Sequence, residues 1–587
     1  MALHAFSSGK PRCPQRVLLL VSVVLAAILA GCDDSPGSDA ERKARLDLII
    51  ANGRVLDGSG NPWFAADVGV LDGVIVAVGD LDDRDAVQRI DVQGNVVAPG
   101  FIDVHSHADD DEGKEEGLRS DDVRRRQAIN IVTQGVTTVT VNSDGDSDPG
   151  LSMAEQRRQL EAGGMGLNVV LMAGHNTIRA DVMGPDYKRY ATPSEIASMQ
   201  KRVREAMEDG AFGLTTGLEY VPGRWSHPDE VVALMEVVAP YDGVHISHMR
   251  SQASSPRWWL PSRDPADPLE LLDGVREIIE IAEQTGTRGV VSHMKVRSMT
   301  HWGQSAEVIK LIEAARRRGV EVYGDQYPYD SSGSDGSLVL IPDWALGLDE
   351  DGDDYQGLAA RLADTIRDPE SRDLLYADIE HRMTFRGGPA KIVIFDHPDE
   401  TLIGKSLLDF AEGQGMSPIE ATIELQMNGF EDRPGGARIR AFSFHEKDID
   451  AMMSQPWVAT SSDGGVALAE DGPTVHARYT GSFPRKIAYY VRERGTVSLE
   501  FAIRAGTSLP AQILGIRDRG LIRPGLVADI VVFDEDRIQD NATFVEPHRL
   551  STGIDYVWVN GEATLFEGEA TGALPGIVLH RDTSGAD

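Results

Sequence analysis

The sequence predicts an α/β fold: a (β/α)8 TIM barrel, a small β-sandwich domain formed from both termini, and an insertion before the last barrel strand. The barrel is predicted by short apolar runs with helical patterns between most of them. The first seven runs begin 31 to 45 residues apart, the spacing of repeated strand–helix units in a parallel sheet. The runs begin near Phe101, Val136, Leu167, Phe212, Val244, Arg288, Val320 and Val458.

The two ends of the chain share a second pattern. Residues 47–99 alternate short apolar runs with turns such as Asp72-Gly73, which is typical of β-hairpins. Residues 515–578 return to this style in the segments ADIVVFD and YVWVNGEA. We therefore expect one small β domain built from 47–99 and 515–578, with the barrel occupying residues 100–514.

The spacing of the apolar runs breaks before the last strand. The gap between Val320 and Val458 is too long for one helix and its loops. Residues from about 330 to 445 are therefore predicted to be an insertion with its own helices and a strand at Ile392 to Phe395.

Composition excludes several classes of protein. The chain has 587 residues, of which 41% are hydrophobic and 26% charged, as in ordinary globular proteins. Its formal net charge of -36 opposes binding to phosphate backbones, so we expect no nucleic-acid partner. Two cysteines are too few for a disulfide scaffold or a Cys-rich zinc module.

Residues 1–31 have the features of a targeting segment. Basic residues precede an uncharged apolar run at 17–30, which is too short to span a bilayer as a settled helix. The run ends in Leu29-Ala30-Gly31-Cys32, which resembles a bacterial lipobox and implies cleavage before Cys32 and lipidation of its sulfur. Residues 32–46 then form a polar tether, and the protein is expected at the bacterial cell envelope, anchored to membrane by lipid and facing the periplasm. A simple secretory signal or a short anchor is the alternative.

Histidines stand at the ends of three predicted strands. His105 and His107 are two apart on a strand, so their imidazoles point to the same side and both reach one metal ion. His248 and His293 each close another apolar run. Barrel enzymes work at the C-terminal ends of their strands. Each of the last two histidines alone could be a core residue, but together the four predict a metal site.

Carboxylates follow two further strands. Asp463 lies in a Gly-flanked turn after the eighth strand, where it can bind metal and take a proton from water. Glu219 follows the fourth strand and is either a further metal ligand or part of a structural salt bridge. Tyr220 beside it is a candidate substrate contact.

The motifs of the chain resemble those of the amidohydrolase superfamily, and more closely its N-acyl-D-amino-acid deacylase (D-aminoacylase) branch. The resemblance covers residues from about 47 to 578. It rests on segments that include PGFIDVHSH, GHNTIR, TTGLEYVPG, SHMR, SHMK, DQYPYDSSGS, SSDGG and GSFPRKI. It implies hydrolysis of the N-acyl amide bond of a small-molecule N-acyl amino acid, often of D configuration.

The resemblance also implies roles for individual residues. One or two divalent ions, usually zinc, would be held by His248 and His293, with His105 and His107 at a second position, and Asp463 matches the catalytic aspartate. On the second strand the branch typically has a metal-binding cysteine, and here Asp144 falls in its place. Asp144 is therefore a candidate ligand with harder oxygen donors, or else part of a loop turn.

The substrate carboxylate needs a cation in a chain this acidic. Lys295, Arg250 and Arg478 are candidates, with Tyr220 and Tyr327 as hydrogen-bond donors. Lys295 and Arg478 could instead form ordinary ion pairs. One rival reading is a cyclic amidase of hydantoinase or dihydroorotase type, but those enzymes usually carry a carboxylated lysine on strand four, where this chain has none. The other rival is a non-catalytic, lipid-anchored binding protein. The oligomeric state is not predicted.

Overall fold

The structure is a computed structural model that describes residues 45–109, 117–264, 266–332, 338–348 and 354–581. The predicted signal segment 1–31 and the predicted lipidation site Cys32 lie outside these residues. Within the described part of the chain, no helix combines the length and apolar character needed to cross a membrane.

Parallel strands form the barrel that the spacing predicts. A three-stranded sheet (β6-β7-β8) continues into a six-stranded one (β9-β10-β11-β12-β13-β16), with β8 and β9 as successive halves of the third strand. Backbone hydrogen bonds from Asp463 N to His105 O and from His107 N to Gly464 O close the ring. The strands are β6 (Phe101–Asp103), β7 (Val136–Val141), β8 (Asn168–Leu171), β9 (Ala173–Gly174), β10 (Gly213–Gly217), β11 (Val244–His248), β12 (Arg288–Val291), β13 (Val322–Gln326) and β16 (Val458–Thr460).

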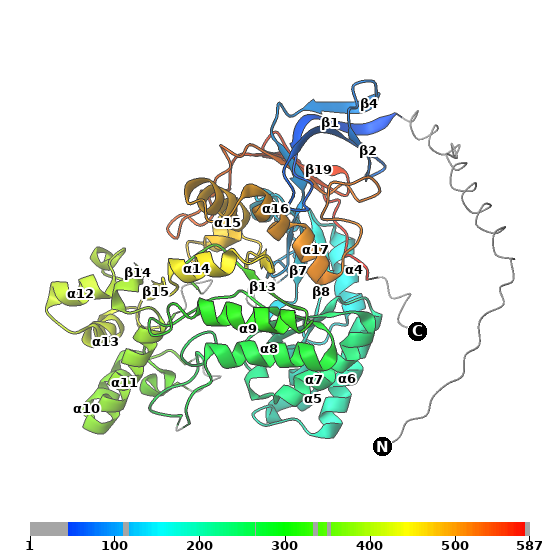
Figure 1. Ribbon diagram of the computed structural model, residues 1–587. Helices are drawn as coiled ribbons and strands as arrows, with labels where there is room; N and C mark the ends of the chain where they lie inside the picture. Colours follow the sequence, from blue (N-terminus) through cyan, green and yellow to red (C-terminus); the bar gives the residue numbers. More distant parts are fainter. Residues whose placement is uncertain (1–44, 110–116, 265, 333–337, 349–353, 582–587) are drawn as a thin grey trace, which may run out of the picture.

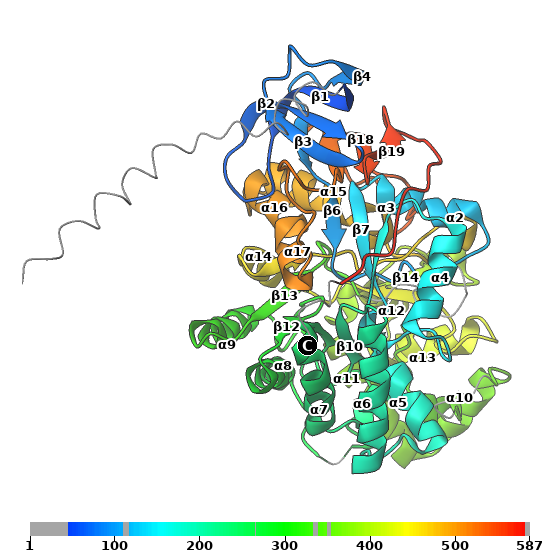
Figure 2. The same cartoon turned by 90° about the vertical axis from the view of Figure 1, so that its right-hand side faces the viewer.

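Helices cover the outside of the barrel (Figures 1 and 2). They begin at sequence signals: α6 has a capping box between Thr192 and Glu195, with Pro193 as its first residue. The helices that flank the barrel strands are α2 (Val123–Gln127), α3 (Ile129–Val132), α4 (Met153–Gly163), α5 (His175–Met183), α6 (Pro193–Glu208), α7 (Pro228–Val238), α8 (Leu271–Thr285), α9 (Ser305–Arg317), α14 (Glu446–Met453), α15 (Arg478–Arg485), α16 (Leu499–Gly506) and α17 (Ser508–Leu514).

Segments that precede and follow the barrel, residues 46–99 and 530–570, form one nine-stranded sheet, at the top of Figure 1. Antiparallel pairing of β17 with β5 joins the late strands to the early ones. The sheet bends until Val74 bridges Val527, so its two halves enclose a shared apolar core, as in a sandwich. Its strands are β1 (Leu46–Val55), β2 (Phe64–Leu71), β3 (Val74–Gly79), β4 (Ala86–Asp91), β5 (Val96–Pro99), β17 (Ile530–Phe533), β18 (Ile554–Val559), β19 (Glu562–Phe566) and β20 (Glu569–Ala570).

The segment between β13 and β16 forms a separate lobe with its own apolar core (Figure 1). Its strand β14 begins at Ile392 and pairs antiparallel with β15. Helix α11 ends at Phe385 beside the mouth of the barrel, where the next residue lines the cavity. The elements of this insertion are α10 (Leu358–Arg367), α11 (Pro369–Phe385), β14 (Ile392–Asp396), α12 (Leu407–Gln414), α13 (Pro418–Asn428) and β15 (Arg438–Ala441).

Candidate metal centre

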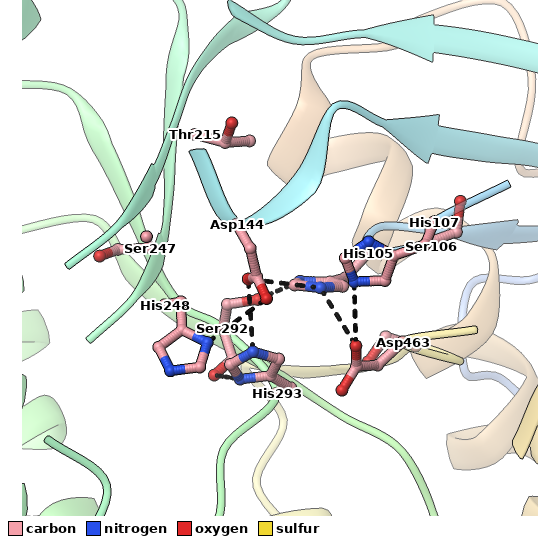
Figure 3. A network of polar contacts seen from close by, with 12 residues as sticks. His105, Ser106, His107, Asp144, Thr215, Ser247, His248, Ser292, His293 and Asp463 are labelled. Carbon is pink, nitrogen blue, oxygen red and sulfur yellow. Dashed lines mark hydrogen bonds and ion pairs between the residues drawn. The ribbon is translucent and has the colours of Figure 1, made fainter. Parts of the chain in front are cut away.

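Four histidines and two aspartates converge at the C-terminal ends of the barrel strands (Figure 3). They come from five strands or the turns that follow them: His105 and His107 after β6, Asp144 after β7, His248 at the end of β11, His293 after β12 and Asp463 after β16. The sequence separates these residues by more than 350 positions, and the closed barrel brings them together because all parallel strands end at the same rim.

The candidate ligand atoms form two overlapping sets. One contains His105, Asp144 and His293, and the other contains His105, His107 and Asp463, with the ligand atoms of each set within 4.8 Å of one another. Asp144 lies between the histidines: its Oδ1 is 3.6 Å from His105 Nε2 and 3.4 Å from His293 Nε2, while its Oδ2 is 3.4 Å from His248 Nδ1.

The same atoms lack other partners. His105 Nε2 and Asp144 Oδ1 are buried and have no hydrogen-bond partner among the described residues. A buried polar atom without a partner costs about 1–3 kcal/mol, so such atoms are expected where a ligand supplies the missing contact. Imidazole and carboxylate donors at this spacing fit one or two divalent metal ions.

The backbone at the site is held in a left-handed conformation. Asp144, His293 and Asp463 have φ values of 55°, 35° and 50°. Non-glycine residues rarely adopt this region, and where they do the strain often marks a functional site. Here it occurs at three side chains of the centre that follow three different barrel strands, β7, β12 and β16.

The charges of the centre stabilise both aspartates in their ionised form. Burial alone would raise the pKa of Asp144, but His293 and His248 hold it well below its usual range. Burial is likewise outweighed at Asp463, where Arg478 and His293 hold the pKa well below the usual value. Arg478 Nη1 lies 2.7 Å from Asp463 Oδ2. Both aspartates are therefore available as ligands or as a proton acceptor.

The Glu219 carboxylate belongs to neither set of candidate ligand atoms. Its Oε2 lies 3.0 Å from Nε2 of His248, whereas the other ring nitrogen of His248 faces Asp144. Glu219 is therefore placed to orient His248 rather than to bind metal directly, as carboxylates behind metal-binding histidines commonly do. Burial would raise its pKa, but the hydrogen bond with His248 and the charge of Arg297 lower it to about 2.

Other supporting groups were not predicted. Gln252 Nε2 lies 3.0 Å from Nδ1 of His293, and Ser292 Oγ lies 2.5 Å from Nδ1 of His105. Asp325, at the end of β13, accepts hydrogen bonds from the hydroxyls of Ser292 and Ser461 and from the backbone N–H of His293. Asp325 is a polar residue at a strand end and could have been predicted in the same way as the histidines. The contacts of Gln252 and Ser292 with the histidines become visible only in the folded structure.

The centre forms the floor of a cavity of about 690 Å³, which Tyr220, Lys295 and Arg478 also line. Tyr327 lies beneath the two cations: its ring centre is 5.3 Å from Lys295 Nζ and 4.9 Å from Arg478 Cζ. Burial, with Arg297 nearby, lowers the pKa of Lys295 to about 7. An incoming carboxylate would favour the charged form of this amine.

The structure does not place Arg250 with these cations. Its Nε donates to the carboxylate of Glu277 on α8 at 2.8–3.0 Å, and its Nη2 donates to Ser226. Arg250 is therefore corrected from a substrate contact to a buried structural ion pair. The strand-end position alone could not show this, because the partner lies 27 residues further along the chain.

A closed (β/α)8 barrel with this histidine–aspartate centre defines a metal-dependent hydrolase of the amidohydrolase class. The model of the Amidohydrolase family matches residues 381–564. D-aminoacylase from Alcaligenes xylosoxydans xylosoxydans is 32% identical over 91% of the chain and 98% of its own length. The chain belongs to the D-aminoacylase family of amidohydrolases, which hydrolyse C–N bonds other than peptide bonds.

Solved structures agree with this assignment. N-acyl-D-glutamate deacylase from Bordetella bronchiseptica, complexed with zinc and a phosphonate inhibitor, has a TM-score of 0.69 and 30% identity, covering 92% of this chain and 100% of its own. A D-aminoacylase structure that addresses a binuclear metal centre has a TM-score of 0.69 and 29% identity, covering 91% and 100%.

Proposed function

We propose that the protein hydrolyses the N-acyl amide bond of N-acyl amino acids, with D configuration preferred. The observation that carries this proposal is a single cavity with the histidine–aspartate centre on its floor and two cations, Lys295 and Arg478, beside it. The centre provides for amide hydrolysis, and the cations provide for the carboxylate that every N-acyl amino acid bears.

Zinc is the proposed metal, bound at one or two positions. Asp144, His248 Nδ1 and His293 Nε2 would hold one ion, and His105, His107 and Asp463 would hold the other. A divalent ion bound here polarises the scissile carbonyl and lowers the pKa of water. The carboxylate of Asp144 is a harder ligand than a thiolate, so manganese or cobalt is a stronger competitor for this chain than for a relative with cysteine.

Asp463 is the proposed proton carrier. Its Oδ1 lies 3.5 Å from His105 Nε2 and 3.3 Å from His107 Nε2, and therefore faces the centre. From there the carboxylate accepts a proton from the attacking water and delivers it to the leaving amine. Arg478 holds the opposite oxygen, Oδ2, which fixes the orientation of the carboxylate.

An amine-release assay over N-acetyl-D- and N-acetyl-L-amino acids tests the proposal, with Asp463→Asn as the control variant. Hydrolysis should depend on added metal and should fall about 10²–10⁴-fold in Asp463→Asn, because general acid–base catalysis contributes this much. Unchanged activity in Asp463→Asn would overturn the mechanism. Hydrolysis of cyclic amides with no N-acyl amino acid turned over would favour the hydantoinase-type rival, although β10 (Gly213–Gly217) contains no lysine to bridge two metals. Protein that takes up no added metal, and that binds an N-acyl amino acid without hydrolysing it, would favour the rival interpretation as a non-catalytic binding protein.

We also propose that the mature protein begins at Cys32 and is held at the bacterial envelope by lipid on that residue, facing the periplasm. The lipobox-like segment at 29–32 and the polar residues that follow it support this proposal. Expression in a bacterial host with radiolabelled palmitate tests it. Label in the membrane fraction is expected for the full chain and is expected to disappear in Cys32→Ala. Secretion of unlabelled protein cut at another position would show a simple secretory signal.

A further inference from the structure

The candidate ligand His105 has a serine hydroxyl, rather than a carboxylate or a carbonyl, behind its ring. Its Nε2 faces the centre, 3.6 Å from Asp144 Oδ1 and 3.5 Å from Asp463 Oδ1. Its Nδ1, on the other side of the ring, lies 2.5 Å from Oγ of Ser292, the residue before His293 (Figure 3). Both His105 and Ser292 are fully buried, so solvent does not compete for this contact.

A hydroxyl does not by itself decide which ring nitrogen carries the proton. Metal binds the imidazole nitrogen that has a lone pair, and the other nitrogen then carries the hydrogen. Groups that only accept stand behind the neighbouring histidines. Glu219 Oε2 lies 3.0 Å from His248 Nε2, and the backbone carbonyl of Ser292 lies 2.6 Å from His293 Nδ1. A serine hydroxyl both donates and accepts, so the proton of His105 must be fixed by a further group.

Asp325 is that further group. Ser292 Oγ donates to Asp325 Oδ2 at 2.9 Å. Asp325 Oδ1 accepts from the backbone N–H of His293 at 2.9 Å and from the hydroxyl of Ser461 at 2.6 Å. An ionised carboxylate, which only accepts, satisfies all three donors. The single hydrogen of Ser292 is then committed to Asp325, and its oxygen accepts from Nδ1–H of His105. The lone pair of Nε2 is thereby directed at the centre.

A structural role accounts for only part of what Asp325 does. Through Oδ1 it ties β12 and β16 to β13, which any buried polar residue of a barrel could do. Through Oδ2 it reaches the ring of a candidate ligand. In the described part of the chain, no lysine or arginine forms an ion pair with this fully buried carboxylate, whose partners are hydroxyls and an N–H. A divalent ion held by His105 would supply the positive charge that favours its ionised form.

We propose that Asp325 and Ser292 are positioning residues of the metal centre. Asp325 orients the Ser292 hydroxyl, and this hydroxyl holds His105 in the tautomer whose Nε2 binds metal. The inference rests on the proposed function, because His105 belongs to both sets of candidate ligands. It makes the metal affinity of the centre depend on Asp325, whose side chain reaches His105 only through Ser292.

Ser292→Ala tests the contact with His105. The variant should bind the zinc ion that His105 helps to hold about 10–100-fold more weakly, the usual effect of removing a group behind a metal-binding histidine. Competition with a chelator measures this affinity without any assay of activity. Ser292→Thr keeps the hydroxyl and should retain most of the affinity. Ser247→Ala is the matched control, because Ser247 is also a buried serine directly before a candidate ligand, but its hydroxyl contacts Thr216.

A second background separates positioning from structure. If Ser292 acts through His105, Ser292→Ala should change zinc affinity little when His105→Ala is already present, since the ring on which it acts is missing. An equal loss in both backgrounds would show that Ser292 only stabilises the barrel, and would overturn the inference. Unchanged affinity in Ser292→Ala alone would overturn it as well. A wild-type protein that binds no divalent metal would overturn the proposed function itself.

NMR of protein with ¹⁵N-labelled histidine rings tests the tautomer in the wild type. In the metal-free protein, at a pH where the ring is neutral, His105 should carry its proton on Nδ1, and its signals are assigned by their absence in His105→Ala. In Asp325→Asn the new amide can donate to Ser292, whose hydroxyl then turns to His105, so the proton should move to Nε2. A wild-type His105 protonated on Nε2, or an unchanged tautomer in Asp325→Asn, would contradict the proposal.

Discussion

Asp144 occupies the middle of the metal centre, with one oxygen toward His105 and His293 and the other toward His248. The sequence alone left open whether this residue is a ligand or part of a loop turn. Its burial, its left-handed backbone and its unpartnered Oδ1 favour the ligand. Asp144 would therefore help to hold the ion proposed at His248 and His293, and its Oδ1 also lies 3.6 Å from His105 Nε2, near the second proposed position. No lysine on β10 could take a similar role.

Replacement of Asp144 is expected to weaken metal binding. Asp144→Ala should weaken metal binding by at least about tenfold, since even the loss of a group that only supports a ligand costs about 10–100-fold. Asp144→Cys should restore binding with a thiolate ligand, visible as a sulfur-to-metal absorption band in the cobalt-substituted protein. Metal analysis after dialysis gives the content of each variant. Asp146→Asn, outside both ligand sets, is the control. Full metal content in Asp144→Ala would assign Asp144 to the turn.

A second prediction concerns Glu219, which contacts the candidate metal ligand His248. Glu219→Gln should weaken metal binding about 10–100-fold, because the carboxylate that orients His248 and increases its basicity is lost. Competition with a chelator measures this change directly. Glu236→Gln, exposed on α7, serves as the control. An unchanged affinity in Glu219→Gln would show that His248 is oriented by its other contacts.

At the level of elements, the positions of the barrel strands were predicted well, whereas the side-chain contacts made between elements were predicted less well. The predicted strand starts agree with the structure within two residues, because each strand is short and fully buried, and most of them begin in an apolar run. The histidines followed from the same rule, since polar side chains at these strand ends share one rim. The ion pair of Arg250 could not be predicted, because its partner Glu277 is brought to it by the docking of α8.

Helices α5 and α7 are joined by a buried ionic contact. Arg179, on α5, is fully buried and pairs with Glu230, on α7, whose other oxygen lies 2.8 Å from His175 Nε2. Glu230→Gln should destabilise the protein by about 3–5 kcal/mol, because it leaves the Arg179 charge buried without compensation. Chemical denaturation measures the loss. Glu283→Gln, which breaks an exposed pair with Arg318, should cost less than about 1 kcal/mol. Similar losses for the two variants would contradict the argument.

The same contact predicts a dependence on pH. Burial would raise the pKa of Glu230, but His175 and Arg179 hold it below the usual value of 4.5. A group whose pKa is depressed by folding contributes stability above its unfolded pKa, and this stability is lost as the pH falls through the folded value. The difference in stability between wild type and Glu230→Gln should therefore be constant near neutral pH and shrink below about pH 4.5. A difference that grows on acidification would show that the charge of Glu230 does not stabilise the fold.

For the molecule as a whole, the terminal sheet and the barrel share a polar junction. Asp529, just before β17, accepts hydrogen bonds from Arg519, from Asn168 on barrel strand β8, and from the backbone N–H of Asn560. Asn560 in turn donates to the side chain of Asn168 at 2.8 Å. Because the strands of this sheet come from residues 46–99 and 530–570, which precede and follow the barrel in the chain, the barrel is constrained on both sides.

This junction predicts that sheet and barrel unfold together. Asp529→Ala should destabilise the protein by about 3–5 kcal/mol, because the Arg519 charge stays buried without its main partner. Asp518→Ala is the control: it removes the second carboxylate near Arg519. Because the Asp518 side chain is 60% exposed, this change should cost less than about 1 kcal/mol. Both variants are followed by denaturation monitored through far-ultraviolet ellipticity and through hydrolytic activity. If the junction couples the two parts, activity and ellipticity are lost in one transition that moves to lower denaturant in Asp529→Ala. Activity that persists after an early partial loss of ellipticity would instead show that the barrel, with its metal centre, holds its structure without the sheet.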